Sequence, residues 1–305
     1  KTFTSLKIVE EYVPENGSVL FLVPSLSLLS QTLREWTSQV KTPMHSFAVC
    51  SDTKIGKNSE DINVHDLAFP ATTDPKRLIK QINTFSERKE LSVIFSTYHS
   101  IQAVSDAQKE GLPKFDLVIC DEAHRTTGAT LPGEDESHFV KIHDPDFIQS
   151  KKRLYMTATP RLFSGDVKET AKEKEVELCS MDDVALYGED FHRLGFGEAV
   201  GGDLLSDYKV MVLAVDEDYV SSTFQDQLAD ADNELKLDDA VKIPGCWNGL
   251  SKKVLDEEGK TYIELDPLPM KRAVAFSRTI KDSKRIKKLF SEIVDEFKKN
   301  HEHDE

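Results

Sequence analysis

The sequence predicts an α/β fold with a parallel sheet that is covered by helices. The first observation is a set of short β-rich runs without polar alternation, at residues 19–23, 47–50, 93–96, 117–120 and 153–156. Continuous apolar strands are typical of parallel sheets that are buried on both faces. The second observation is that segments with helical periodicity lie between several of these runs. Alternation of strands and helices indicates an α/β sheet.

Three helices are predicted within the first 85 residues. Apolar residues recur at positions 3, 6, 9 and 13, then at 26, 29, 33 and 36, and then at 78, 79, 82 and 85. These spacings place the apolar residues of each segment on one helical face. Asp74 and Pro75 favour a helix start at the third segment, because Asp caps helix N-termini and Pro suits the first helical position.

Composition limits the class of protein. The chain has 305 residues, of which 30% are charged and 39% hydrophobic, and its formal net charge is −15. These values suit a globular protein of one large or two ordinary domains. No apolar run approaches the roughly 18 residues of a membrane span, so no membrane partner is expected. The acidic balance argues against a broadly basic nucleic-acid coat protein, but it is compatible with a channel that makes local contacts.

The four cysteines are far apart and form no CxxC pair. This spacing argues against a zinc site and against a dense disulfide framework. A reducing compartment, the cytoplasm, is therefore the expected location.

A second α/β unit is predicted to follow residue 205. Strands are expected at 209–215 and 272–276, and a helix is expected at 279–299. Residues 216–239 are acidic, and the stretch at about 216–270 is interpreted as a partly helical insert. The predicted domains are thus 1–205 and 206–305, and the second is partial because a complete α/β domain needs several more strands. The chain is expected to be a fragment of a longer protein.

The strongest candidate site is Asp121-Glu122-Ala123-His124, directly after the predicted strand 117–120. Ligands bind at the carboxyl ends of strands in open α/β sheets. Of two adjacent carboxylates, one can hold Mg²⁺ through its water shell, and the other can orient or deprotonate the water that attacks a γ-phosphate. The alternative is a helix N-cap beside the helix dipole.

Two further segments point to nucleotide chemistry. Lys1-Thr2 before a helix matches the end of the phosphate-binding loop G-x-x-x-x-G-K-[ST], whose lysine meets the β- and γ-phosphates and whose hydroxyl binds Mg²⁺. Thr157 and Thr159 follow the last predicted strand of the sheet and can bridge the acidic pair to a nearby ligand. The alternatives are an arbitrary chain end for the first segment and a threonine-capped turn before Pro160 for the second.

Taken in order, these segments resemble the motifs of superfamily two helicases and translocases of the DEAH-box kind. Lys1-Thr2 matches the end of motif I, and residues 23–25, together with Leu28, Leu29 and Gln31, match motif Ia. Residues 95–97 match motif Ib, residues 121–124 match motif II, residues 157–160 match motif III and residues 276–278 match motif IV. The resemblance implies a RecA-like ATPase domain of the P-loop NTPase kind, followed by a partial second RecA-like domain.

A narrower resemblance is to the motor subunits of restriction enzymes, and among them to the single-polypeptide type I-like (type ISP) restriction–modification family. It rests on Arg125 and on segments 155–161, 195–200, 205–210 and 246–250. That family joins a nuclease, a helicase-like ATPase and a methyltransferase in one chain. The resemblance implies a motor that uses ATP and Mg²⁺ to move on double-stranded DNA, with nuclease and methyltransferase domains as partners in the parent chain.

The resemblance also implies roles for individual residues of the nucleotide site. Lys1 would contact the phosphates, Thr2 and Asp121 would hold the Mg²⁺, and Glu122 would act on the attacking water. Three residues of the same cofactor site would couple the nucleotide state to DNA binding: His124, Thr157 and Thr159.

A second set of residues would lie along the nucleic-acid backbone. Its members are Pro24, Ser25, Ser96, Thr97, Ser277 and Arg278. Hydroxyl and backbone N–H groups can position phosphates without a large positive surface, which is compatible with a net charge of −15. Weak and salt-sensitive DNA binding by the chain alone is expected.

Two parts of the motif series have no match in these 305 residues. The glycines of motif I would form the backbone cradle for the phosphates, and motifs V and VI would bring the arginine that stabilises the γ-phosphate in the transition state. We therefore expect the intact parent to hydrolyse ATP on DNA and the isolated chain hardly to do so.

Three alternatives remain from the sequence. One is a strand-separating DNA or RNA helicase of repair or RNA processing, and another is a non-catalytic scaffold with a RecA-like fold. The third takes His301, His303 and Asp304 as metal ligands, for which a frayed polar terminus is the favoured interpretation.

Overall fold

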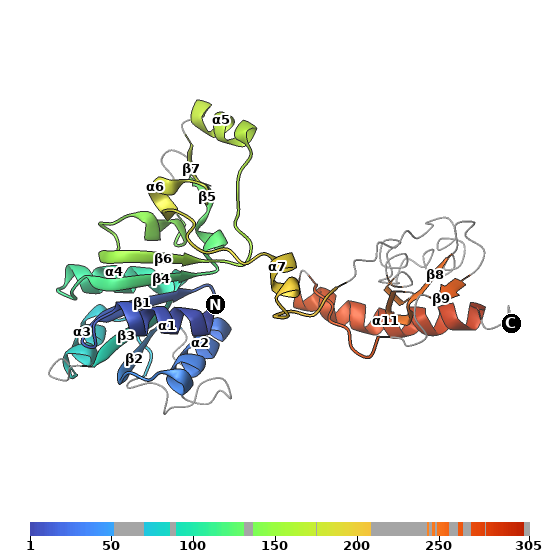
Figure 1. Ribbon diagram of the computed structural model, residues 1–305, viewed down its shortest axis with the longest axis horizontal. Coiled ribbons are helices and arrows are strands. Elements are labelled where there is room, and N and C mark those ends of the chain that lie inside the picture. Colours follow the sequence, from blue (N-terminus) through green and yellow to red (C-terminus); the bar gives the residue numbers. More distant parts are fainter. Residues whose placement is uncertain are drawn as a thin grey trace. The chain divides into compact units, whose positions relative to one another are not determined.

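The structure is a computed structural model. The chain divides into two compact units, Lys1–Arg193 and Leu194–Glu305 (Figure 1). The residues that the structure describes are 1–51, 70–85, 90–130, 137–174, 176–208, 243, 246–247, 249–255, 262–264, 270–277 and 279–301. The domain boundary predicted between residues 205 and 206, and the interpretation of the second part as RecA-like, stay predictions.

A parallel sheet of five strands forms the centre of the first unit, in the order β2-β3-β1-β4-β6 (Figure 1). The strands are β1 at Ser18–Val23, β2 at Met44–Val49, β3 at Leu91–Thr97, β4 at Phe115–Asp121 and β6 at Ser150–Met156. Each strand overlaps one of the five apolar runs, so the predicted fold class is confirmed. Because all neighbours are parallel, the carboxyl ends of the strands share one edge of the sheet.

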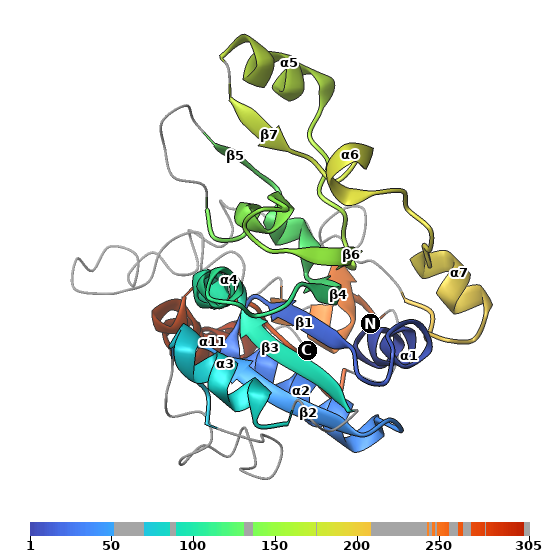
Figure 2. The ribbon, with the colours of Figure 1, turned by 90° about the vertical axis from the view of Figure 1, so that its left-hand side faces the viewer.

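Helices cover both faces of this sheet (Figure 2). One face packs against α1 (Thr2–Tyr12) and α2 (Leu26–Gln39), and the other against α3 (Pro75–Asn83) and α4 (Ile101–Lys109). Successive side chains of a strand point to opposite faces, so Phe21 of β1 joins the first core and Leu20 joins the second.

The third predicted helix is confirmed in its starting residue. α3 begins at Pro75, and the Asp74 side chain accepts hydrogen bonds from the backbone N–H groups of Lys76 at 2.9 Å and Arg77 at 3.2 Å. The carboxylate satisfies helix donors that have no partner within the helix.

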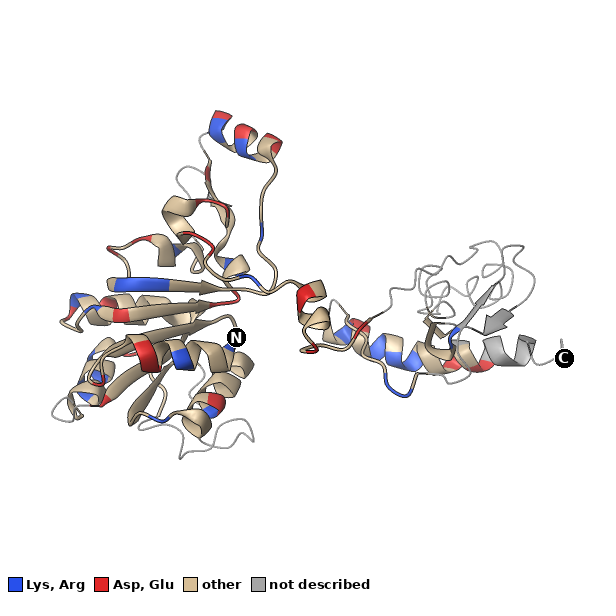
Figure 3. Ribbon diagram, in the orientation of Figure 1, with Lys and Arg blue, Asp and Glu red and all other residues tan. Residues whose placement is uncertain are grey.

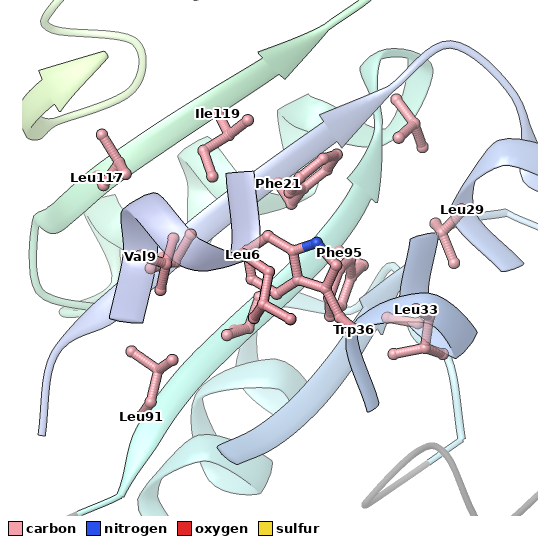
Figure 4. Packing of buried hydrophobic residues seen from close by; sticks show 14 of the residues in the cluster. Leu6, Val9, Phe21, Leu29, Leu33, Trp36, Leu91, Phe95, Leu117 and Ile119 are labelled. Atoms are coloured by element: carbon pink, nitrogen blue, oxygen red, sulfur yellow. The ribbon is translucent and has the colours of Figure 1, made fainter. Parts of the chain in front are cut away.

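Trp36 is the centre of the core between α1, α2 and the sheet, and its side chain is fully buried (Figure 4). Its ring meets Phe21 and Phe95 edge-on, with centroid distances of 5.2 and 5.6 Å. The indole Nε1 also donates a hydrogen bond of 3.1 Å to the backbone carbonyl of Thr2. Trp36 therefore fills the core and also fixes the first turn of α1, where the candidate site begins.

A small appendage lies beyond the edge strand β6 (Figures 1 and 2). We use this name for the two-stranded antiparallel sheet of β5 (Gly128–Thr130) and β7 (Glu177–Cys179), with α5 (Gly165–Glu173) and α6 (Val184–Tyr187). We refer to residues Asp121-Glu122-Ala123-His124 as the acidic box. Because β5 comes shortly after the acidic box, the pairing fastens this later segment to the region of the candidate site.

The second unit contains the predicted final helix, observed as α11 at Ile280–His301. Leu289 on this helix is buried, with 6% of its surface exposed. Basic side chains gather along its first half (Figure 3). The same unit also contains α7 (Phe196–Gly201) and the antiparallel pair of β8 (Lys253–Leu255) and β9 (Tyr262–Glu264).

The prediction of a strand at 272–276 is wrong. Residues 272–277 have no regular secondary structure, and Val274 and Phe276 are 80% and 95% exposed. A strand requires a neighbouring strand for its backbone hydrogen bonds, and no described strand pairs with this segment. The strand predicted at 209–215 and most of the predicted insert lie outside the described residues. No helix in the described part of the chain is both long and apolar enough to cross a membrane.

Replacement of Trp36 by Phe should destabilise the first unit by about 1–3 kcal/mol, because it removes core volume and the hydrogen bond to Thr2. Urea unfolding followed by circular dichroism measures this change. The control is Tyr12→Phe on the exposed side of α1, where we expect a change within about 0.5 kcal/mol. Equal unfolding midpoints for Trp36→Phe and Tyr12→Phe would contradict the stabilising role assigned to Trp36.

Asp116 links three strands and gives a prediction for acid stability. Its carboxylate accepts hydrogen bonds from the Ser18 backbone N–H at 2.9 Å and from Lys151 Nζ at 2.5 Å. Burial works to raise the pKa of Asp116, but the bonds from Lys151 and Ser18 outweigh it, so the pKa lies below the ordinary value of 3.8.

A depressed folded-state pKa means that this stabilisation is present above the unfolded-state pKa and is lost as the pH falls through the folded-state pKa. Urea midpoints measured between about pH 6 and about pH 2 should therefore fall more steeply for the wild type than for Asp116→Asn. Parallel curves for the two proteins would show that Asp116 makes no such contribution.

Candidate active site

The parallel topology brings the predicted site residues to one edge of the sheet. Val23 at the end of β1 is in register with Thr97 of β3, and Asp121 of β4 is in register with Met156 of β6. The residues that follow these strands, where the sequence places its motifs, therefore lie along the carboxyl edge. The start of α1 reaches the same edge, as the contacts of Lys1 show.

Lys1 is ion-paired with both carboxylates of the acidic box. Its Nζ lies 3.3 Å from Asp121 Oδ1 and donates a hydrogen bond to Glu122 Oε1. Burial works to lower the pKa of the Lys1 ammonium, but the hydrogen bond and charge of Glu122, with the charge of Asp121, raise it above 10.5. The structure thus brings together the predicted phosphate ligand and the predicted catalytic acids.

The first turn of α1 offers free backbone donors. Lys1 occupies the N-cap position, no side chain caps the helix, and its first turn contains no acidic residue. Thr2 is half-buried at this point, and its carbonyl accepts from Trp36. Free N–H groups and the positive end of the helix dipole favour an anion.

Asp121 ends β4 in a buried position, with 5% of its surface exposed. Its Oδ1 is buried and accepts no hydrogen bond from the described residues. A buried carboxylate oxygen without a donor requires a compensating cation, and the Lys1 ammonium supplies that charge. An oxygen in this state also suits Mg²⁺, a hard cation that prefers carboxylate ligands.

Glu122 has a left-handed backbone conformation, with φ 50° and ψ 46°. For an L-residue this conformation costs roughly 1–2 kcal/mol. It turns the chain out of β4 into the short 3₁₀ helix η3 (Ala123–Thr126), and the Arg125 N–H closes the turn on the Glu122 carbonyl at 2.9 Å. The turn therefore sets where the Glu122 carboxylate can lie.

His124 connects the acidic box to the end of β6. Its Nδ1 lies 2.9 Å from Thr157 Oγ1 and 3.4 Å from Glu122 Oε2. The Thr157 hydroxyl also accepts a hydrogen bond of 3.2 Å from the Thr159 backbone N–H. The two motifs are thus in direct contact.

The residues predicted to lie along a nucleic acid differ in exposure. Ser25 is exposed and accepts from the Leu28 N–H at 3.4 Å, while Pro24 beside it is buried. Ser277 is half-buried in the second unit, and Arg278 lies outside the described residues.

Ser96 and Thr97 are buried, because they end a central strand. Ser96 has no exposed surface and donates to the Thr97 carbonyl, and the Thr97 hydroxyl donates to Ser100 Oγ at 3.2 Å. In this structure neither hydroxyl is available to a nucleic acid.

Sequence reasoning missed Tyr98, which directly follows these residues. Its side chain is fully buried, and its hydroxyl donates a hydrogen bond of 2.9 Å to the Asp121 carbonyl. An aromatic residue at the end of a predicted strand was the available signal. Tyr98 directly follows β3, and its hydrogen bond fixes the end of β4.

The parallel sheet, the start of α1 beside Asp121 and Glu122, and the contact of His124 with Thr157 define a RecA-like domain of the helicase class. The family model described as type III restriction enzyme, res subunit, matches residues 1–162. The chain belongs to this family.

Relatives support the same assignment. The probable helicase A859L of African swine fever virus is 29% identical over 217 residues in isolate Pig/Kenya/KEN-50/1950 and 31% identical over 218 residues in strain Badajoz 1971 Vero-adapted. Each match covers 70% of this chain and 20% of the viral protein.

Two solved structures resemble nearly the whole chain. The ATP-dependent type ISP restriction–modification enzyme LlaBIII bound to DNA is 43% identical, with a TM-score of 0.75. A nuclease-deletion mutant of the type ISP enzyme LlaGI, in complex with a DNA substrate mimic, is 37% identical, with a TM-score of 0.65. Each match covers 97% of this chain and 19% of that chain, so this chain spans about one fifth of the length of its relatives. The resemblance to the type ISP family is confirmed.

The strain at Glu122 gives a prediction that is independent of catalysis. Glu122→Asn and Glu122→Gln both remove the carboxylate, but Asn tolerates the left-handed conformation better than Gln. We expect the Asn variant to be more stable by up to about 1 kcal/mol, measured by urea unfolding.

The matched control is the same pair of substitutions at Glu110, an exposed residue with φ −87°. There Asn should have no such advantage. A Gln variant at position 122 that is as stable as the Asn variant would argue against strain at this residue.

Proposed function

We propose that this chain is the ATP-hydrolysing motor part of a type ISP-like restriction–modification enzyme and couples ATP hydrolysis to movement on DNA. The observation that carries the proposal is the ion pairing of Lys1, at the start of α1, with Asp121 and Glu122 at the end of β4. Because the chain spans about one fifth of its relatives, the activity is proposed for the full-length gene product.

The residues at the sheet edge fit ATP and Mg²⁺. Lys1 and the free N–H groups of the first turn of α1 would bind the phosphates, and Thr2 and the buried Asp121 oxygen would hold the metal ion. Bound Mg²⁺ would neutralise the charge that develops on the phosphates. With a nucleotide present, Lys1 can exchange its carboxylate partners for phosphate oxygens, and the Glu122 carboxylate is then free.

Glu122 is the proposed catalytic base. Its carboxylate would orient the attacking water and accept a proton from it while the water oxygen bonds to the γ-phosphorus and the bond to the β-phosphate oxygen breaks. His124 contacts both Glu122 and Thr157, so a shift of Glu122 on hydrolysis would be transmitted through His124 to the end of β6. Together with Thr159, this contact is the proposed link between nucleotide state and DNA.

DNA is the proposed track, in double-stranded form. The LlaBIII and LlaGI structures contain DNA or a DNA substrate mimic, and both are similar to this chain over 97% of its length. Exposed Ser25 lies at the carboxyl edge of the sheet and can contact a phosphate. Nuclease and methyltransferase domains of the same polypeptide are the proposed partners.

The direct test is Glu122→Gln in the full-length gene product. The substitution should lower ATP turnover by about 10²–10⁴-fold, because it removes the base, and it should leave Mg²⁺-dependent ATP binding in place. Steady-state hydrolysis with and without linear duplex DNA measures the first effect, and nucleotide titration measures the second. The control is Glu110→Gln, at the exposed C-cap of α4.

Two results would overturn this function. Turnover in Glu122→Gln equal to that of the wild type would remove Glu122 from the reaction. Failure of the wild type to bind ATP saturably with Mg²⁺ would instead support a scaffold role.

A strand-separating helicase is the second candidate, and the viral relatives, described as probable helicases, favour it. The two candidates differ in what happens to the duplex. A translocase displaces a third strand from a triplex without separating the duplex, whereas a helicase releases single strands. We expect triplex displacement without strand release.

A further inference from the structure

A polar network joins the turn after the acidic box to the appendage. Thr126, the last residue of η3, is fully buried. Its hydroxyl donates a hydrogen bond of 2.8 Å to the Ala123 carbonyl and lies 3.0 Å from the Tyr187 hydroxyl. Because the single hydroxyl proton of Thr126 goes to Ala123, Tyr187 is the donor to Thr126.

His143 also contacts Thr126, through the Thr126 backbone carbonyl. Its Nε2 lies 3.1 Å from the Thr126 carbonyl, and its Nδ1 lies 3.0 Å from the Tyr155 hydroxyl. A carbonyl only accepts, so Nε2 carries the ring proton, and Nδ1 of the neutral ring accepts from Tyr155. One tautomer of His143 therefore satisfies both contacts.

The surroundings favour these neutral forms. Burial lowers the pKa of His143, which keeps the ring uncharged near neutral pH. Burial likewise raises the pKa of Tyr155 and of Tyr187, so both hydroxyls keep the protons that they donate.

The side-chain rings of His143, Tyr155 and Tyr187 come from separate parts of the chain and pack on one another. Tyr155 lies on β6, His143 ends the 3₁₀ helix η4 (Val140–His143), and Tyr187 ends α6. The ring centroids of the three pairs are between 4.7 and 5.5 Å apart. We refer to His143, Tyr155 and Tyr187 as the aromatic clamp.

The clamp acts on the turn that carries Glu122. The backbone at Glu122 is left-handed, and such a conformation persists only where the surroundings determine it. One end of the turn is closed by the Arg125 N–H on the Glu122 carbonyl. At the other end, Thr126 holds the Ala123 carbonyl and is itself held by the clamp through both its hydroxyl and its carbonyl.

We propose that the aromatic clamp is a set of positioning residues that fixes the turn after Glu122, so that the appendage is part of the catalytic machinery. The clamp acts through Thr126 and Ala123, not on the nucleotide. The pairing of β5 with β7, which begins two residues after Thr126, fastens the appendage at the same place. The catalytic consequence of this inference rests on the proposed function.

The first experiment measures ATP turnover of the full-length gene product with duplex DNA. His143→Ala removes both hydrogen bonds and should lower kcat by roughly tenfold to a hundredfold, while the KM for ATP stays within about twofold of the wild type, because a displaced base slows chemistry but not binding. His143→Gln can still donate to Thr126 and accept from Tyr155, so it should restore most of the loss. Tyr187→Phe keeps the ring and should lower kcat in the same direction by less, and Tyr12→Phe is the unaffected control.

The second experiment needs no activity. Hydrogen exchange of the peptide that covers residues 119–130 should be faster in His143→Ala and in Tyr187→Phe than in the wild type, and unchanged in Tyr12→Phe. Circular dichroism checks that each variant is folded. If His143→Ala fails to fold, Tyr187→Phe, which retains the ring, decides the question.

The outcomes separate this inference from the proposed function. Wild-type kcat and wild-type exchange in Tyr187→Phe, together with no rescue by His143→Gln relative to His143→Ala, would overturn the clamp and leave the ATPase in place. Absence of ATP turnover in the wild type would overturn the proposed function, and the exchange measurement would still decide whether the clamp holds the turn.

Discussion

The pairing of Lys1 with the two carboxylates after β4 is the contact on which the site depends. It follows from the direction of α1, which runs back against the strands and so places its first turn at their carboxyl edge. Trp36 secures that position, because its indole bonds to the Thr2 carbonyl while its ring packs on Phe21 and Phe95. The geometry of the proposed nucleotide site thus depends on the packing of the core beneath it.

The same contact offsets features that are unfavourable on their own. Asp121 and Glu122 are adjacent like charges, Asp121 is buried, and Glu122 has a strained backbone. A fold selected for stability alone would avoid such a combination, and proteins retain it where chemistry requires it. The lysine compensates the charge in this structure, and phosphates with Mg²⁺ would exchange with it during the proposed reaction.

Much of the sheet and of the candidate site was predictable because it is encoded locally. Continuous apolar runs marked the five strands, Asp74 and Pro75 marked the start of α3, and the acidic box followed a strand. The strand at 272–276 was predicted by the same rule and failed, since a strand also needs a partner that local sequence does not specify. β5 and β7 have three residues each, too few for a periodic signal, and the burial of Ser96 results from neighbours on both sides of β3.

The free energies involved support a role for the appendage in holding the turn at Glu122. A left-handed glutamate costs roughly 1–2 kcal/mol. The hydrogen bonds from His143 and Tyr187 to Thr126 contribute about 0.5–1.5 kcal/mol each, and loss of His143 deprives the buried Thr126 carbonyl of this donor at a cost of about 1–3 kcal/mol. Because these energies match or exceed the strain, the aromatic clamp is sufficient to hold the turn at Glu122, which the closing bond from Arg125 alone would hold less firmly.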